Sequence, residues 1–527
     1  MVTADLPSLA TLAPFSNTPF TDFSKPENVR AQHEALRQVE AEFGQTYPLI
    51  IGAERRSKAD IFTTFNPAQS EQALAHFVKA DVKDAHDAIQ AAWERFRTWQ
   101  YTSAAERAGY LFRAAELLRQ RRFYFNALMI YEVSKTWPEA DGDTAEAIDF
   151  LEFYGREALR LAEEQPLTKI AGEENQLVYV PLGVGAVIPP WNFACAIMAG
   201  LTTSAIVAGN TIVLKPASTA ALVAARFVDL LHETGLPDGV VNFLPGPGGI
   251  VGDALVEHPL TRFVSFTGSR DVGLRINELA AKPRPGQKWI KRTILEMGGK
   301  DSIIVDETAD VEAAANAIVT SAFGFQGQKC SACSRAILVE GVYDAVLEKV
   351  VEKARLLTVG DPTEPENDLG AVIDENAYRK IQSYIEIGKR EGRLVLGGEP
   401  LRREGYFVPP TVFADVPPAA RISTEEIFGP VLAVVKAYDF DEAMEIANNT
   451  EYGLTGSLFS ANRERIARAE REFQAGNLYI NRKCTGAMVG AHPFGGFNMS
   501  GTDSKAGGPD YLFLFTQAKS IGEKVTR

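Results

Sequence analysis

Apolar residues in the first third of the chain recur at helical spacing and predict a set of packed helices. Ser103 and Glu106 have the spacing of a capping box, which predicts that a long helix starts there. Residues 124–161 continue the helical pattern, with breaks expected at Trp137-Pro138 and at Asp141-Gly142-Asp143. The clearest helical face is formed by Val82, Ala85, Ile89 and Ala92.

From residue 184 onward the pattern changes to short apolar runs that alternate with helical stretches. Repeated strand–helix units predict a mostly parallel sheet covered on both faces, so the expected fold class is α/β. A second series of this kind starts near Asp301 and extends to about Asn481. Ligands of such folds bind beyond the carboxyl ends of the strands. The runs of the first series are Val184–Ile188, Thr211–Leu214, Val240–Leu244, Phe263–Phe266 and Thr293–Leu295.

One long segment, Asn175 to Leu214, carries no charged residue and raises the possibility of a membrane span. A span needs only about 20 apolar residues. Pro189-Pro190, Asn192 and several glycines interrupt this segment, and they suit buried strands and a helix of an α/β core. We therefore expect no membrane partner.

Composition narrows the class of protein further. The chain has 527 residues, which predicts two or three domains, and its formal charge is 54 − 68 = −14. Such an acidic surface repels phosphate backbones and argues against nucleic acid as a partner. Residues 1–7 lack the basic start of a secretory signal, and four cysteines are too few for a disulfide scaffold. These features predict a reducing, cytoplasmic location.

A thiol and a carboxylate 34 residues apart suggest covalent catalysis. Cys330 follows Gly327-Gln328-Lys329, and Glu296 lies in Leu295-Glu296-Met297-Gly298-Gly299. A buried cysteine is usually an apolar filler, but this loop is polar and Lys329 could favour the thiolate. Glu296 follows an apolar strand and precedes glycines, so partial burial would raise its pKa toward that of a general base. Together they could capture a carbonyl and then release it to water.

Cys330 and Cys333 also form a Cys-x-x-Cys pair, which could bind zinc or act as a dithiol. Zinc would need two further ligands at suitable spacing, and the chain has no second cysteine pair. A thioredoxin-like site would need a strand before the motif and a helix after it. Here a helical run, Val311–Phe325, precedes the motif and a strand, Arg335–Val339, follows it. Both alternatives are weak, and we expect no metal.

Two glycine loops compete for a phosphate-binding role. The loop Gly246–Gly252 resembles a dinucleotide fingerprint, but Val251 replaces its third glycine. The loop Phe266–Gly273 follows a strand and opens a helix, where backbone N–H groups and Ser269 could hold a pyrophosphate. Lys215 ends a strand and is either solvated or a donor to a ribose. Asn192 could donate to a developing oxyanion.

Taken together, these residues resemble the aldehyde dehydrogenase superfamily over roughly residues 45–525. Each motif is weak alone, but seven in the same order are very specific. They are Pro190-Trp191-Asn192-Phe193, Lys215-Pro216-Ala217-Ser218, Phe266-Thr267-Gly268-Ser269, Leu295-Glu296-Met297-Gly298-Gly299, Gly327-Gln328-Lys329-Cys330, Glu425-Glu426-Ile427-Phe428-Gly429-Pro430 and Pro493-Phe494-Gly495-Gly496.

The resemblance implies the aldehyde dehydrogenase fold, with a Rossmann-like cofactor domain, an α/β catalytic domain and a small β oligomerisation hairpin. It also implies a homodimer or a dimer-based higher oligomer, with a hairpin near Glu174–Pro181 and the C-terminal tail crossing between subunits. The expected division is an N-terminal arm at 1–44, an NAD-binding domain at 45–165 and 182–295, a catalytic domain at 296–496, and an oligomerisation segment at 166–181 and 497–527.

The resemblance also implies roles for the residues. Cys330 attacks an aldehyde, while Asn192 and the Cys330 backbone N–H hold the oxyanion. Hydride passes to NAD, and Glu296 activates the water that hydrolyses the thioester. The residues expected to bind the cofactor are Ile188, Pro189, Trp191, Lys215, Ser218, Gly268, Ser269, Glu426 and Phe428. Many NAD-specific relatives carry Glu at the position of Ser218, so NADP is expected as a poorer substitute.

Within the superfamily, residues 329–335 and 485–490 are similar to a subfamily that oxidises glutamate γ-semialdehyde, formed from pyrroline carboxylate, to glutamate in proline catabolism. In that subfamily the substrate carboxylate binds at positions matching Ser331, Gly486 and Ala487. Phe193 and Phe494 would flank the aliphatic chain. Glu146 is a candidate for the substrate ammonium, although an exposed helix carboxylate is an alternative interpretation.

Three other functions are considered. A CoA-acylating relative would lack Glu296, and a structural relative would lack Cys330, so both are disfavoured. A non-acylating enzyme for another semialdehyde, such as succinate semialdehyde, is the serious alternative. The length leaves no room for a fused proline dehydrogenase barrel of roughly 250 residues, so a separate proline dehydrogenase is the expected functional partner.

Overall fold

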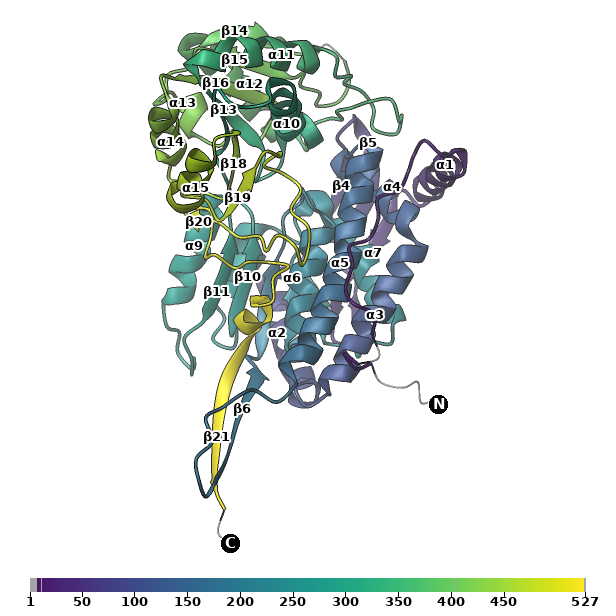
Figure 1. The fold of residues 1–527 in the computed structure, drawn as a ribbon. Coiled ribbons are helices and arrows are strands. Elements are labelled where there is room, and N and C mark those ends of the chain that lie inside the picture. Colours follow the sequence, from purple (N-terminus) through teal and green to yellow (C-terminus); the bar gives the residue numbers. More distant parts are fainter. Residues whose placement is uncertain (1–6, 11, 402, 526–527) are drawn as a thin grey trace.

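Two seven-stranded sheets form the frame of the protein, one in each half of the chain (Figure 1). The computed structural model describes residues 7–10, 12–401 and 403–525. Residues 1–6, 11, 402 and 526–527 lie outside the described residues. They include parts of the expected arm, catalytic domain and tail, and the start of the segment tested for a secretory signal. Among the described helices, none is long and apolar enough to cross a membrane.

The first sheet has the strand order β11-β10-β7-β8-β9-β2-β3. Its strands from β7 to β11 pair in parallel, while β2 and β3 add antiparallel strands at one edge. All five predicted runs are strands, because buried parallel strands appear in sequence as continuous apolar segments. The bounds are β2 Leu49–Ile51, β3 Glu54–Arg56, β7 Val184–Ile188, β8 Thr211–Leu214, β9 Val241–Phe243, β10 Phe263–Thr267 and β11 Arg292–Glu296.

Helices from the first half pack around this sheet. Ser103 Oγ accepts a hydrogen bond from the Glu106 N–H at 3.2 Å, so the helix begins where the capping pattern predicts. The break predicted at Asp141-Gly142-Asp143 is wrong, because α5 continues through these residues. The bounds are α1 Pro26–Glu40, α2 Val82–Trp99, α3 Ala104–Gln120, α4 Arg122–Val133, α5 Trp137–Leu161, α6 Ala196–Val207, α7 Ala221–Glu233, α8 Asp253–Glu257 and α9 Arg270–Ala281.

Tertiary partners explain why α5 does not break. The Asp141 carboxylate accepts two hydrogen bonds from Arg122, and Asp143 forms an ion pair with Lys135 at 2.9 Å. Both aspartates are buried, so their charges are satisfied by other elements and not by solvent. These contacts offset the low helix propensity of Asp and Gly, and they place the helix against the site described below.

The second sheet has the order β14-β15-β16-β13-β12-β18-β19, in which only β14 is antiparallel to its neighbour among the described strands. The predicted second strand–helix series is therefore present. The strands are β12 Asp301–Val305, β13 Cys333–Val339, β14 Arg393–Leu396, β15 Thr411–Ala414, β16 Val431–Ala437, β18 Thr455–Phe459 and β19 Asn477–Ile480. The helices are α10 Val311–Phe323, α11 Tyr343–Arg355, α12 Glu375–Glu391, α13 Arg421–Thr424, α14 Phe440–Asn448 and α15 Arg463–Glu472.

A two-stranded ribbon projects from the body near the C-terminus (Figure 1). β6, Glu173–Pro181, pairs antiparallel with β21, Thr516–Lys524, along its whole length. The remaining strands are β1 Gln45–Tyr47, β4 Ile61–Asn66, β5 Gln69–Val78, β17 Tyr452–Gly453 and β20 Phe497–Asn498.

Candidate active site

The loop that carries Cys330 is held by buried side chains of its own. Phe325 and Gln326 have left-handed backbone φ angles of 50° and 55°, which non-glycine residues adopt only when the surroundings demand it. Gln326 Nε2 donates to the backbone carbonyls of Ser134, at 3.0 Å, and Ala371, at 2.7 Å. The chain is therefore turned and fixed just before the thiol.

The surroundings of Cys330 disfavour its thiolate in this structure. Burial raises the pKa of the thiol well above its usual range, and the carboxylates of Asp301 and Glu296 raise it further. The expectation that Lys329 favours the thiolate is wrong, because Lys329 Nζ forms an ion pair with Glu139 at 2.7 Å. Lys329 is adjacent to Cys330 in the sequence, but its long side chain binds the Glu139 carboxylate on α5 instead of contacting the sulfur.

Glu296 is the last residue of β11, opposite Thr267 of β10. Its side chain is 7% exposed, and Ser504 Oγ donates to its Oε1 at 2.5 Å. Burial raises its pKa to about 8, in the direction that the sequence predicts for a general base. Among the described residues, none forms a hydrogen bond with Oε2. A free buried carboxylate oxygen is well suited to accept a proton from water. Ser504 was missed by sequence reasoning.

Asn192 connects the loop after β7 to the nucleophile loop. Its side chain is buried, and its Nδ2 donates to the backbone carbonyl of Gln328 at 3.0 Å. An amide carries two N–H groups, so one remains to donate to an oxyanion formed near Cys330. The buried contact fixes the amide in position before any substrate arrives.

Cys330 and Glu296 line one internal cavity of about 110 Å³. All six residues predicted to bind the substrate line the same cavity: Phe193, Ser331, Gly486, Ala487, Phe494 and Glu146. These residues come from α5, the loop after β7, the nucleophile loop and the chain after β19, so the fold brings together segments up to about 350 residues apart. The reacting groups and the predicted specificity residues therefore line the same cavity.

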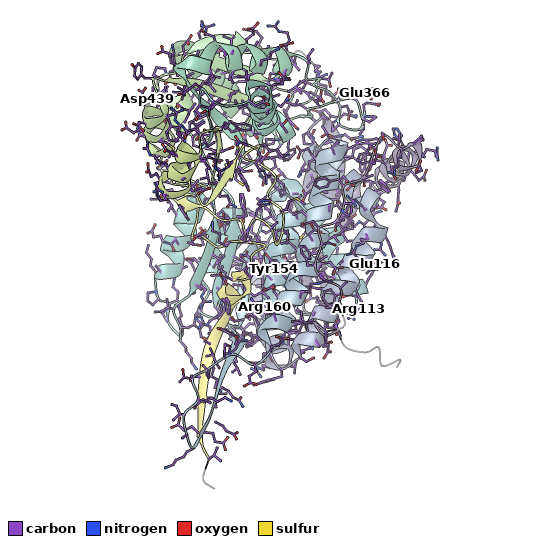
Figure 2. All side chains as sticks on the ribbon, in the orientation of Figure 1. Arg113, Glu116, Tyr154, Arg160, Glu366 and Asp439 are labelled. Carbon is purple, nitrogen blue, oxygen red and sulfur yellow. The ribbon has the colours of Figure 1, made fainter. Side chains whose placement is uncertain are left out.

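Aromatic residues complete the wall of this cavity. Phe150 and Tyr154 line it, and they stand four and eight residues after Glu146 on α5, on one helix face. Tyr154 stacks on Tyr511 at 5.4 Å between ring centroids, where α5 meets the C-terminal segment (Figure 2). Helical spacing from Glu146 could have identified the two α5 residues in the sequence. Tyr511, on a separate segment, offers no such signal.

Glu146 is not an exposed helix carboxylate. It is partly buried and lines both the inner cavity and an adjoining outer cavity of about 310 Å³. Burial raises the pKa of Glu146 to about 8, with a further increase from Asp143. A cationic group bound beside it would reverse this effect and favour the carboxylate. The position suits a ligand that brings a positive charge.

The residues predicted to bind the cofactor gather at the carboxyl edge of the first sheet. Ile188 ends β7 and Pro189 follows it, while Gly268 and Ser269 connect β10 to α9. Ser269 is the N-cap of α9 and no side chain caps the first turn, so the helix start is available to an anion. A Cβ at Gly268 would lie 2.6 Å from the Phe266 ring, so only glycine fits at this turn.

Lys215 lies directly after β8 and is buried, not solvated. Burial lowers the pKa of Lys215 to about 8, and its Nζ donates to the Pro216 carbonyl at 2.9 Å. No acidic side chain in the described ranges pairs with Lys215, so its buried ammonium has N–H groups left to donate to ribose hydroxyls. Ser218 is exposed three residues further on.

The cofactor is expected to bind between these residues and a second set, Glu426, Phe428 and Trp191, and this expected site is called the cofactor cleft. Glu426 Oε1 accepts from the Gly299 N–H at 3.0 Å, and a Cβ at Gly298 would lie 2.4 Å from its carboxylate oxygens. Phe428 packs edge-on against Trp191, with ring centroids 5.6 Å apart. The two halves of the molecule therefore meet at the residues predicted to hold a nicotinamide and its ribose.

Cys333 has a structural environment of its own. It is buried at the start of β13, and its Sγ donates to the Arg335 carbonyl at 3.3 Å. Helix α10 precedes the motif and β13 follows it, which is the order that the sequence predicts. Within the described part of the chain, no group of three His, Cys, Asp or Glu side chains is placed to hold a metal ion.

These features define an enzyme of known class: the chain belongs to the aldehyde dehydrogenase family, whose model matches residues 54–521. It is 59% identical to the 1-pyrroline-5-carboxylate dehydrogenase of Geobacillus thermodenitrificans (strain NG80-2) over 510 residues, 97% of this chain and 99% of that relative. The family and the α/β fold predicted from the sequence are confirmed.

Two solved structures extend the comparison. The 1-pyrroline-5-carboxylate dehydrogenase from Thermus with bound NAD has a TM-score of 0.96 and 51% identity, covering 98% of this chain and 100% of that one. Proline utilization A from Bdellovibrio bacteriovorus also has a TM-score of 0.96, with 41% identity. That match covers 98% of this chain but 54% of the Bdellovibrio chain.

Proposed function

We propose that this protein oxidises L-glutamate γ-semialdehyde to L-glutamate with NAD. The observation that carries the proposal is the single cavity shared by Cys330, Glu296 and the six residues expected to recognise this substrate. The relatives named as 1-pyrroline-5-carboxylate dehydrogenases, at 59% and 51% identity over nearly the whole chain, support the same substrate.

The first chemical step forms a bond between Cys330 and the aldehyde carbon. The Cys330 thiol gives its proton to water and its sulfur attacks the carbonyl carbon, which leaves a negative charge on the oxygen. Asn192 Nδ2 and the Cys330 backbone N–H donate to this oxyanion and stabilise the thiohemiacetal. The residues at the carboxyl edge of the first sheet would hold NAD, which would supply the hydride acceptor for this carbon; loss of the hydride would leave a thioester on Cys330.

Glu296 then activates the water that hydrolyses the thioester. Its carboxylate takes a proton from water, the hydroxide attacks the thioester carbon, and the bond to Cys330 breaks. The departing Cys330 thiolate takes the proton from Glu296, and the new carboxylic acid loses its own proton to water. The products are therefore the γ-carboxylate of glutamate and the regenerated thiol. A relative that transferred the acyl group to CoA would not need this base, and the buried, partly unpaired Glu296 therefore favours hydrolysis.

The substrate headgroup would be held at two places. Glu146 faces its ammonium, while the Ser331 hydroxyl and the backbone at Gly486 and Ala487 donate to its carboxylate. Phe193 and Phe494 enclose the carbon chain between these groups and the thiol. Succinate semialdehyde is one carbon shorter and has no ammonium, so it would leave Glu146 buried without a partner.

NAD fits the residues at the carboxyl edge of the first sheet. The free first turn of α9 would receive the pyrophosphate, Lys215 the adenine-side ribose, and Glu426 the ribose next to the nicotinamide. Ser218 is neutral and does not repel a 2′-phosphate, so NADP is proposed as a poorer substitute. The first sheet with its helices would form the cofactor domain, and the second the catalytic domain.

The proposal also covers the assembly, location and partner of the enzyme. The ribbon of β6 and β21 would lie between subunits of a homodimer or a larger dimer-based assembly. The four cysteines are free thiols, which suits the reducing cytoplasm. A proline dehydrogenase would supply the precursor of the substrate, and the similarity to proline utilization A from Bdellovibrio bacteriovorus, at 41% identity over 98% of this chain, supports such a link.

The test compares NADH formation from glutamate γ-semialdehyde, succinate semialdehyde and pentanal. We expect kcat/KM for glutamate γ-semialdehyde to exceed the other two by about 100-fold or more, because both charges of the headgroup are matched. The same assay with NADP should give a lower but measurable rate. Equal or higher efficiency with succinate semialdehyde would favour the alternative substrate.

A further inference from the structure

Residues 12–25 are the part of the expected N-terminal arm that lies before α1, and they run along α5 (Figure 1). From here on, the arm means residues 12–25 only. Arg156 of α5 donates from its Nε and Nη2 to the Ala13 carbonyl, at 3.3 and 3.2 Å. Phe15 packs edge-on against Phe153, with ring centroids 5.3 Å apart. The arm is thus bound to the outer side of the helix that carries Glu146.

Asp149 is the main acceptor for the arm. The Thr18 N–H donates to its Oδ1 at 2.7 Å, and Asn17 Nδ2 donates to its Oδ2 at 2.9 Å. The carboxylate is 4% exposed, so these bonds are charge-assisted and largely shielded from water. Such contacts hold a segment without regular secondary structure in one position.

Asn17 makes a second contact, with a residue outside α5. The same Nδ2 donates to the backbone carbonyl of Val489 at 2.9 Å. Gly490 follows, with φ of 77°, and a Cβ there would lie 3.1 Å from the Phe15 ring. The arm therefore packs directly against the loop that ends at Gly490.

These contacts connect the two halves of the proposed headgroup site. Asp149 lies one helical turn after Glu146, which faces the substrate ammonium. Val489 lies two residues after Ala487, whose backbone faces the substrate carboxylate. Asn17 Nδ2 is thus hydrogen-bonded to both elements. The outer cavity, lined by residues of both elements, opens beside it.

We propose that Asn17 is a positioning residue, and that the arm fixes the distance between the ammonium and carboxylate subsites. This inference rests on the proposed function and deepens it, because it concerns recognition of an α-amino acid group and not the chemistry at Cys330. Loss of the Asn17 amide should loosen the loop at Gly486 and Ala487 relative to α5. Binding of the charged headgroup should weaken, while reaction of a simple aldehyde should not.

The experiment uses the full-length protein and three aldehydes of five carbons. Glutamate γ-semialdehyde carries both charges, 5-oxopentanoate carries only the carboxylate, and pentanal carries neither. Asn17→Leu keeps the shape of the side chain and removes its hydrogen bonds. We expect KM to rise about tenfold for glutamate γ-semialdehyde, less for 5-oxopentanoate, and not for pentanal, with kcat nearly constant.

Thr21→Val is the matched control. Thr21 Oγ1 donates to Asp141 at 2.6 Å, so this variant also loses one bond from the arm to a buried α5 carboxylate, but none to the loop. It should leave the ratio of KM values unchanged, and thermal unfolding of both variants should be similar. Equal KM increases for all three aldehydes, or none, in Asn17→Leu would overturn the inference. If the wild-type protein itself did not prefer glutamate γ-semialdehyde to pentanal, the proposed function would fail instead.

Discussion

At the scale of single residues, burial sets the protonation state of the proposed base. Burial raises the pKa of Glu296 to about 8, so at pH 7 most molecules carry a neutral carboxyl that cannot accept a proton. The fraction that can act rises as the pH rises through 8. The pH dependence of the hydrolytic step therefore reports on this residue.

For the wild-type protein we expect kcat, when hydrolysis limits it, to rise by up to about tenfold per pH unit below 8 and to level off above. Glu296→Gln cannot take the proton from water. It should release about one NADH per site in a rapid burst and then turn over about 100- to 10,000-fold more slowly, without this pH dependence. Stopped-flow absorbance of NADH measures both phases.

Cys330→Ser is the companion variant, and it should abolish both the burst and the steady rate because no thioester forms. A Glu296→Gln protein that turned over at the wild-type rate would show that another group activates the water.

The sequence indicates candidate reacting residues but not the residues that hold them in position. Cys330, Glu296 and Asn192 stand in motifs whose neighbours indicate their chemistry. Ser504, which donates to Glu296, lies 208 residues further along the chain in a segment without such a motif. Lys329 is a second example, because its adjacency to Cys330 in the sequence did not indicate that it pairs with Glu139. Contacts of this kind depend on tertiary packing.

At the scale of elements, strands were easier to predict than helix boundaries. Buried parallel strands such as β7 and β8 are apolar throughout, and their bounds match the predicted runs. The break predicted within α5 rested on local propensity at Asp141, Gly142 and Asp143. Partners on other elements overrode that propensity, and no local pattern indicates them.

The turn between β11 and β12 allows a test at this scale. Gly298 lies where a Cβ would meet the Glu426 carboxylate, which accepts a bond from the Gly299 N–H. Gly298→Ala should displace Glu426 from the cofactor cleft and raise the Kd for NAD by about tenfold, because a displacement of this kind typically costs about 1–3 kcal/mol. Titration of the intrinsic protein fluorescence with NAD measures the change.

Gly341→Ala is the control for this substitution. A Cβ there meets its nearest neighbour at 3.5 Å, an ordinary contact, and the residue lies outside the cleft. Its Kd for NAD should equal that of the wild-type protein. If Gly298→Ala also bound NAD normally, Glu426 would have no part in holding the cofactor.

At the scale of the whole molecule, the ribbon of β6 and β21 projects from the body, and its strand β21 is largely uncovered by the described residues. Every residue of β21 after Thr516 is exposed, including Ile521, and two-stranded ribbons are marginally stable alone. A second subunit that covers the ribbon would explain its persistence. The expectation of an oligomer can therefore be tested at the exposed ribbon.

Ile521→Asp tests this expectation with a single charge on the ribbon. Burying an unpaired carboxylate at a subunit interface is unfavourable, so the variant should shift the population toward the 57.5 kDa single chain at low micromolar concentration. Leu356→Asp is the control, since Leu356 is exposed at the end of α11 and far from the ribbon in the chain. Sedimentation velocity across a concentration series separates the two outcomes. A wild-type protein that sediments as a single chain, or an Ile521→Asp variant with unchanged assembly, would mean that the ribbon is not the interface.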